Sequence, residues 1–119
     1  MSKTAAKDAQ TRTSGLGVER RYSTAGVHPF DQVEWELRDA IIGDPESPAF
    51  EKREVEFPAS WSQNATNIVA QKYFRGPLGT DRRERSVRQM IDRVAGTITR
   101  WGVKDGYFAT DDDAQAFED

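Results

Sequence analysis

The stretch Phe57–Gly76, FPASWSQNATNIVAQKYFRG, stands out in a chain that is otherwise densely charged. It carries no ionisable side chain from Ser60 to Gln71, yet it ends in Lys-Tyr-Phe-Arg-Gly. A neutral surface of this kind suits packing against a neighbouring domain, because burying an unpaired charge there costs several kcal/mol, on the order of 3 or more. Asn and Gln can also position a substrate, but we favour a packing surface.

The same stretch has the signals of a helix. Ser60 or Ser62 can cap its start, because a serine hydroxyl accepts a hydrogen bond from an N–H group that the first turn leaves unpaired. The apolar residues that fall on one face at helical spacing are Ala65, Ile68, Val69 and Tyr73. Gly76-Pro77 is a typical helix end. We predict a helix at about 61–74.

Two runs of alternating apolar and charged residues precede this helix. The first is QVEWELRDAII and the second is AFEKREVEF. Their apolar members are Val33, Trp35 and Leu37, then Phe50, Val55 and Phe57. Alternation with period two is typical of half-buried strands, and the intervening GDPESP is rich in turn formers. We predict a β-hairpin with strands at about 32–42 and 49–57 and a longish loop.

Two further helices are predicted after Gly76. The first, at about 81–101, has Asp81 and Glu84 at capping-box spacing and Gly102 as its natural stop. Its apolar residues recur at three- and four-residue steps and are Val87, Met90, Ile91, Val94, Ile98 and Trp101. The second, at about 110–119, has Thr110 as cap and three aspartates where the helix dipole favours negative charge. Because this helix has barely begun at Asp119, we expect a larger or split parent protein.

The whole chain has 119 residues, enough for one small α+β domain that is mainly helical. Residues 1–15 lack periodicity and are predicted to be a disordered leader, whereas 16–119 form the domain and 16–24 a short strand or extended arm. The sequence contains no apolar run long enough to span a membrane and no signal peptide, so we expect a cytoplasmic protein.

Catalytic and metal-binding residues are not evident. The chain has no cysteine, which excludes thiol chemistry and disulfides within it, and its one histidine, His28, has no partner with which to form a metal tetrad. The adjacent Asp111, Asp112 and Asp113 point in different directions on a helix and cannot converge on one ion. The arginine-rich stretch 72–100 reads as a solvated face, a contact with an acidic surface or, less favoured, a nucleic-acid site.

Four segments closely resemble, in this order and spacing, the N-terminal region of class II, vitamin B12-dependent ribonucleotide reductases. They are GVHPFDQVEWELRDA, VEFPASWSQNATNIVAQKYFRG, RSVRQMIDRVAGTITRWG and GYFATDDDAQAF. The resemblance runs from about Leu16 to Asp119 and is most specific from Trp61 to Gly76. The residues that carry the wider S-x-N-A…Y-F…R-V-A pattern are Ser62, Asn64, Ala65, Ile68, Tyr73, Phe74, Arg93, Val94 and Ala95.

The resemblance implies a function in DNA synthesis. The family reduces ribonucleotides to deoxyribonucleotides, using adenosylcobalamin to generate a thiyl radical on a cysteine inside an α/β barrel, and a thioredoxin-like system renews the cysteine pair that supplies electrons. This chain resembles the region before the barrel and has none of those cysteines. We therefore expect it to lack the barrel, to bind no cofactor alone, and to be inactive alone although its family is the ribonucleoside-diphosphate reductase type.

The resemblance implies that the partner of this chain is the catalytic barrel of the same reductase, on the same or a separate chain. The ribonucleotide substrate and the thioredoxin-like reductant would interact with the full enzyme. The predicted contact, here called the packing segment, packs on the barrel or lies near the substrate. It consists of Trp61, Ser62, Asn64, Asn67, Lys72, Tyr73, Phe74 and Arg75. The alternative is a stand-alone module that binds nucleic acid or an acidic protein through its arginine-rich helix.

Overall fold

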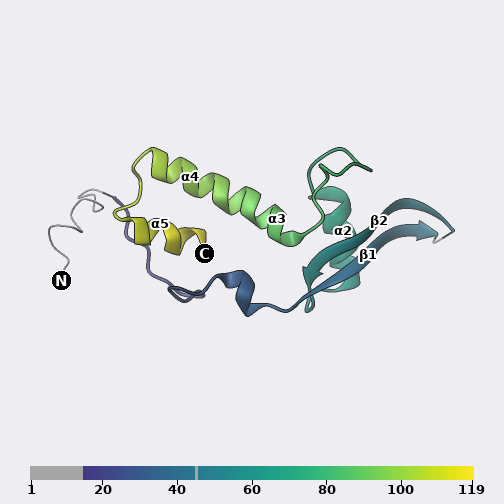
Figure 1. Ribbon diagram of the computed structural model, residues 1–119, viewed down its shortest axis with the longest axis horizontal. Coiled ribbons are helices and arrows are strands. Elements are labelled where there is room, and N and C mark those ends of the chain that lie inside the picture. The colour runs from purple at the N-terminus through teal and green to yellow at the C-terminus, as the bar shows by residue number, and fades with distance from the viewer. Residues whose placement is uncertain (1–14, 45) are drawn as a thin grey trace. The chain divides into compact units, whose positions relative to one another are not determined.

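The computed structural model describes residues 15–44 and 46–119, so nearly all of the predicted leader lies outside the described residues. Two units divide the chain: unit 2 is the continuous segment 33–93, and unit 1 combines the residues up to Gln32 with 94–119 (Figure 1). In chain order the elements are η1 (Pro29–Gln32), β1 (Trp35–Asp44), β2 (Ser47–Pro58), α2 (Gln63–Lys72), α3 (Val87–Ile91), the π-helical turn η2 (Asp92–Gly96), α4 (Thr97–Lys104) and α5 (Asp111–Glu118). A hairpin followed by helices confirms the predicted α+β class. None of the described helices is long and apolar enough to cross a membrane.

The strands of the unit 2 hairpin extend further toward the turn than predicted, and the loop is shorter. β1 and β2 are antiparallel, with Trp35 opposite Pro58 at the open end and Asp44 opposite Ser47 at the turn. The prediction of a longish loop was therefore wrong. Gly43 adopts a φ of 95°, a conformation that glycine takes at little cost, and this lets the strands continue into the turn-forming residues.

A β-bulge interrupts the hairpin at its middle. Arg53 and Glu54 of β2 together oppose the single residue Asp39 of β1. Asp39 holds both of them: its Oδ1 accepts the Glu54 N–H at 3.1 Å, and its Oδ2 pairs with Arg53 at 3.0 Å. The extra residue shifts the alternation of β2 by one. Phe50 and Val55, five positions apart, are consequently both buried.

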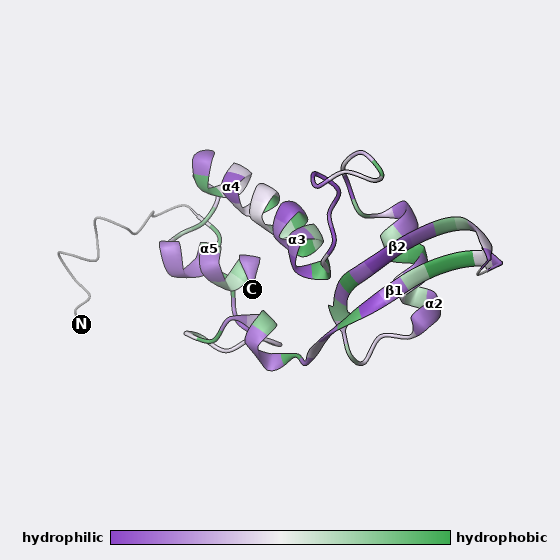
Figure 2. Ribbon diagram, turned by 45° about the vertical axis from the view of Figure 1, so that its right-hand side comes forward, coloured by the Kyte–Doolittle hydropathy of each residue, from purple (hydrophilic) through white to green (hydrophobic). Residues whose placement is uncertain are grey.

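The core of unit 2 forms where α2 packs on the hairpin. Its buried apolar residues are Ala40, Phe50, Val55, Phe57, Ala70, Phe74 and Val87. Figure 2 shows hydrophobic stretches along both strands, with α2 beside them. The buried face of α2 carries Thr66 and Ala70, whereas Ile68 is 40% exposed and Tyr73 is 59% exposed. The predicted face was therefore right for Val69, which packs against the core, and wrong for Ile68 and Tyr73.

The predicted helix at 81–101 begins later, at Val87, and changes from α- to π-helical hydrogen bonding in its middle. Ser86 caps α3, and Gln89 completes a capping box with it, so the predicted start at Asp81 with Glu84 was wrong. The π-helical turn η2 then connects α3 to α4 without a break. Gly102 does not end the helix, since α4 runs to Lys104. Gly102 is instead buried, and a Cβ added there would lie 2.6 Å from the Phe108 ring.

Unit 1 is built from an N-terminal and a C-terminal segment of the chain. The segment after Gly15 is an extended arm with one bridge between Leu16 and Phe108: the Leu16 N–H donates to the Tyr107 carbonyl at 2.7 Å. Arg20 pairs with Asp119 at 2.9 Å. α5 contacts α4 and lies beside it in Figures 1 and 2. Thr110 caps α5 as predicted, accepting the N–H of Asp113.

Candidate functional site

The N-terminal end of α2 is held by an arginine from β1. The Arg38 guanidinium donates to the carbonyl oxygens of Ala59 at 2.9 Å and Trp61 at 2.6 Å, and to Thr66 Oγ1 at 2.8 Å. Its side chain is only 10% exposed and is paired with Glu36. The alternation in the sequence places Arg38 among the outward charges. The structure instead turns it toward α2, so that one cation satisfies several oxygens at once.

The C-terminal end of α2 is held by a second arginine. Buried Arg83 donates to the carbonyl oxygens of Ala70 at 2.8 Å, Gln71 at 3.1 Å and Gly76 at 3.1 Å. The last carbonyls of a helix have no partner within it and carry partial negative charge, so a cation is favoured there. Sequence reasoning missed this residue, because no local pattern distinguishes Arg83 from its neighbour Arg82.

A third arginine extends this contact to the residue after α2. Arg93 donates to the Tyr73 carbonyl at 3.0 Å and to Glu84 at 2.9 Å. Burial disfavours the charged form of Glu84, but hydrogen bonds from Arg93 and from the Arg75 N–H outweigh it and hold the pKa of Glu84 below its ordinary value. The hydrogen bond to Glu84 in turn raises the pKa of Arg93. Both groups therefore stay charged near neutrality, as a structural contact requires.

The packing segment is divided between the core and the surface. Phe74 is 2% exposed and belongs to the core, Trp61 packs partly against it, and the hydroxyl of Ser62 is used as the cap of α2. The remaining members are exposed or half-buried: Asn64, Asn67, Lys72, Tyr73 and Arg75. The outward surface of α2 is thus neutral along its length, with two cations at its C-terminal end.

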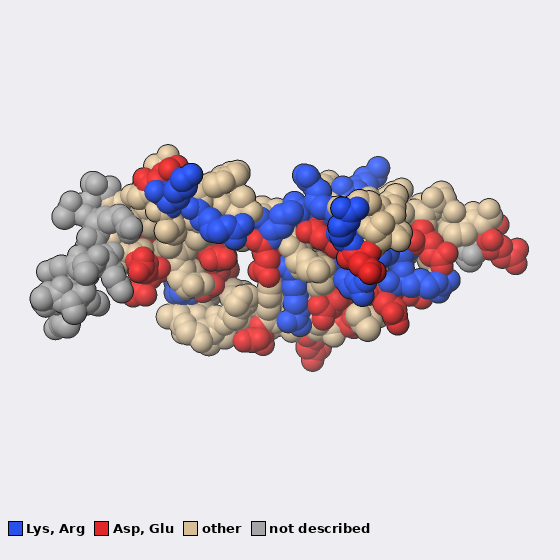
Figure 3. Space-filling view, turned by 45° about the horizontal axis from the view of Figure 1, so that its top comes forward, with Lys and Arg blue, Asp and Glu red and all other residues tan. Residues whose placement is uncertain are grey.

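The arginine-rich stretch does not present one basic surface. Arg83 and Arg93 are used internally, and Arg88 lies 4.4 Å above the Trp35 ring and 3.1 Å from Glu56. Arg82 and Arg85 are exposed. In the hairpin unit, Figure 3 shows blue cationic side chains interspersed with red acidic ones. This arrangement does not favour a nucleic-acid site, which calls for a concentrated basic patch.

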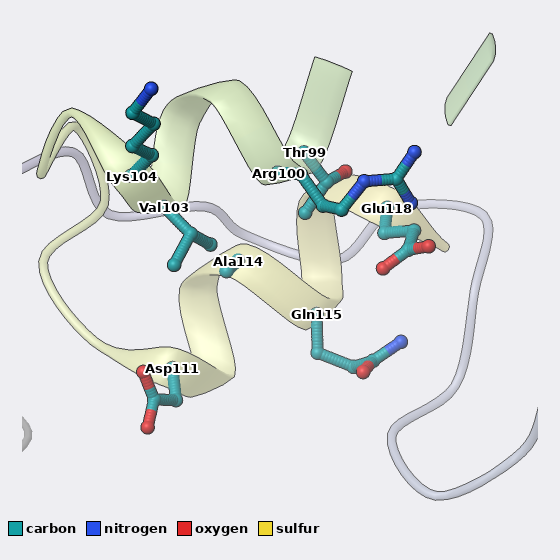
Figure 4. A pocket seen from close by; sticks show the side chains of 8 residues that line it. All are labelled: Thr99, Arg100, Val103, Lys104, Asp111, Ala114, Gln115 and Glu118. Carbon is teal, nitrogen blue, oxygen red and sulfur yellow. The ribbon is translucent and has the colours of Figure 1, made fainter. Parts of the chain in front are cut away.

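A groove of about 590 Å³ lies between α4 and α5 in unit 1. Figure 4 shows Val103 and Ala114 facing each other inside it, while Lys104 and Asp111 point away from it on opposite sides. Arg100 and Glu118 lie beside each other, so the charged side chains do not form a cluster of carboxylates inside the groove. Among the described residues, no group of three His, Asp or Glu side chains could hold a metal ion.

Comparison with known proteins assigns the family. The family model described as class II vitamin B12-dependent ribonucleotide reductase matches residues 39–119. The vitamin B12-dependent ribonucleotide reductase of Streptomyces avermitilis is 50% identical over 110 residues, 91% of this chain and 11% of that protein. That of Streptomyces coelicolor is 51% identical over 106 residues (87% and 11%), and that of Rhodopirellula baltica 50% over 107 residues (87% and 10%). This chain spans about a tenth of the length of the relatives it matches. It belongs to the class II vitamin B12-dependent ribonucleotide reductases.

Proposed function

We propose that the chain is the N-terminal part of an adenosylcobalamin-dependent ribonucleotide reductase, which reduces ribonucleotides to deoxyribonucleotides for DNA synthesis. Its role is to pack on the catalytic barrel through the outward surface of α2. The names of its relatives support the reaction. The chain spans only about a tenth of those relatives, which favours a structural role for it, with the chemistry carried out by the rest of the enzyme.

The observation that carries the proposal is the way α2 is held. Arg38 and Arg83 fix its two ends, so the helix is rigid without any charge of its own before Lys72. Its free surface presents Asn64 and Asn67 together with Ile68 and Tyr73, two apolar side chains left about half exposed. A rigid, neutral and partly apolar surface can be buried at low cost in desolvation and in conformational entropy.

The residues present do not fit a cobalamin site or a radical site. The chain has no cysteine to carry a thiyl radical or to supply electrons. Its single histidine directly precedes η1, where His28 Nδ1 accepts the Phe30 N–H at 3.1 Å and the ring packs on that of Phe30. We therefore assign no chemical step to this chain. The cofactor, a ribonucleoside diphosphate substrate and a thioredoxin-like reductant all bind to the catalytic region. The chain alone is inactive.

A chimera tests the proposal. The matching region of the Streptomyces avermitilis reductase is replaced by this chain, and deoxyribonucleotide formation is measured with adenosylcobalamin and a dithiol. We expect turnover by the chimera and none by the 119-residue chain alone. An inactive but folded and cobalamin-binding chimera would contradict the assigned role, as would turnover by the chain alone.

The surface itself is tested by placing a charge on it. In the chimera, Tyr73→Asp buries a carboxylate in the proposed contact, and we expect activity to fall at least about tenfold. The matched control is Tyr22→Asp, at a tyrosine of unit 1 that is 94% exposed. Equal activity of the two variants would show that α2 is not part of the contact with the catalytic barrel.

A further inference from the structure

Unit 1 has a patch of apolar side chains that its own fold leaves partly exposed. The patch consists of Leu16, Ile98, Trp101, Tyr107 and Phe117, which are about half exposed each. Together with buried Phe108 they line an apolar cavity of about 240 Å³. Phe108 packs on Phe117 at 5.3 Å between ring centroids and on Gly102, so the cavity is built on a fixed base.

We propose that this cavity receives a bulky apolar side chain from the catalytic region of the same reductase polypeptide. The inference rests on the proposed function and adds to the α2 surface a second contact, made by unit 1. Tryptophan and tyrosine at the rim of a pocket are the residue types that contribute most to protein contacts, because they bury large areas at a small entropic cost.

Two other occupants fit the cavity less well. Residues 1–14 contain no aromatic or branched aliphatic side chain, so they supply no bulky group apart from Met1. A second copy of the chain would need about 800 Å² on each partner for a stable interface. The exposed parts of the five patch residues amount to roughly 500 Å², taking about 200 Å² for each whole side chain.

A contact within one polypeptide needs less area. The relatives carry about nine-tenths of their length outside the region that matches this chain. Covalent connection gives such a partner a millimolar effective concentration, so a patch too small for a dimer still suffices. Patches of roughly 300–600 Å² are already the largest that a typical monomer leaves exposed, and are commonly functional.

Hydroxyl-radical footprinting of the 119-residue chain and of the Streptomyces avermitilis chimera tests the proposal. Mass spectrometry gives the oxidation rates of Trp101 and Tyr107, and of Tyr22 as an exposed reference. We expect the rates at Trp101 and Tyr107 to fall severalfold in the chimera, with that at Tyr22 unchanged. In a Trp101→Ala chimera, protection of Tyr107 is lost, whereas Tyr22→Ala leaves it in place.

Equal oxidation of Trp101 in the chain and in the chimera would overturn the inference. So would protection in the isolated chain that increases with its concentration, which identifies a second copy as the occupant, or protection removed by deleting residues 1–14. Turnover of the unmodified chimera tests the proposed function separately. An active chimera with a fully oxidised Trp101 refutes only the inference, and an inactive chimera with a protected Trp101 refutes only the function.

Discussion

Arg38 and Arg83 direct their guanidinium groups at backbone oxygens at the two ends of α2, and Arg93 reaches the carbonyl just beyond it. Arginine suits this task because its planar group carries five donors in a fixed geometry, whereas lysine has one compact ammonium. Cations from elsewhere in the chain thus satisfy the ends of a helix whose single charged residue is Lys72, in its last turn. This is why the neutral stretch from Ser60 to Gln71 can be stable without local ion pairs.

Replacing Arg83 tests this role. Arg83→Ala leaves buried carbonyl oxygens without a donor, and we expect the free energy of unfolding to fall by about 3 kcal/mol. The matched control is its exposed neighbour, for which Arg82→Ala should change the stability by less than about 0.5 kcal/mol. Urea titration followed by circular dichroism measures both. Similar values for the two variants would contradict the role given to Arg83.

Asp113 links the arm of unit 1 to α5, and its contribution depends on pH. A hydrogen bond from the Val18 N–H, followed by one from the Thr110 hydroxyl, lowers the pKa of Asp113. The folded-state pKa lies below the unfolded one, so the stabilisation is present above about pH 4 and is lost as the pH falls through the folded value. We expect Asp113→Asn to be less stable than the wild type at neutral pH.

Urea titrations over a pH series check this dependence. The difference in unfolding free energy between the wild type and Asp113→Asn should shrink toward zero as the pH falls below about 4. Asp112→Asn, at the exposed neighbouring position, serves as control and should show little difference throughout. A difference for Asp113→Asn that does not vary with pH would contradict the assignment.

At the scale of elements, the bulge in β2 decides which residues of the hairpin are buried. Glu54 has a φ of 57°, in the left-handed region that side chains other than glycine adopt at a cost. The Asp39 carboxylate compensates part of that cost by accepting the Glu54 N–H. The bulge is therefore held by one side chain on the opposite strand.

Substitutions at Glu54 measure the remaining strain. Glu54→Gly relieves it but gains freedom in the unfolded chain, so we expect a net stabilisation of about 0.5 kcal/mol. Glu54→Val should destabilise by about 1–2 kcal/mol, since a β-branched residue is poorly accommodated there. Thermal unfolding compares the two with Arg53→Gly, which should lose stability. A destabilised Glu54→Gly would mean that the bulge is not strained.

What the sequence predicted depended on how local the signal was. The cap at Thr110 was predicted, and Ser62 was one of the two caps proposed for α2, because a cap and the N–H groups that bond to it lie within a few residues. The start of α3 was missed because Asp81 and Glu84 have the same spacing as Ser86 and Gln89, and only packing of Val87 in the core distinguishes them. The five-residue interval from Phe50 to Val55 was the one visible sign of the bulge.

The surfaces of the candidate site were harder to predict. The neutral stretch was visible in the sequence, but the buried face of α2 was not, since Ile68 and Tyr73 are as apolar as the residues that pack. Likewise, no sequence signal separates the internal Arg83 from the exposed Arg82 and Arg85. The choice depends on which carbonyl oxygens the fold brings within reach, a property of tertiary structure.

At the scale of the whole molecule, the two units differ in how the chain builds them. Unit 2 is one continuous segment, whereas unit 1 requires its N-terminal arm to meet 94–119. Removing α5 should therefore affect unit 1 alone. In a chain that ends at Ala109, we expect the amide signals of Leu16–Arg20 to lose their dispersion, with those of β1, β2 and α2 retained. Two-dimensional NMR of both chains measures this, and loss of the β1 and β2 signals would contradict it.

The ion pair between Arg20 and Asp119 has a consequence for synthesis on the ribosome. Translation delivers the arm before its partners, with the whole of unit 2 in between. Unit 2 can fold as soon as Arg93 has emerged, but the arm must wait until α5 has been made. During that interval Phe108, which is 5% exposed in the folded unit, is not yet covered by the arm, so unit 1 exposes an aromatic side chain that the finished unit buries.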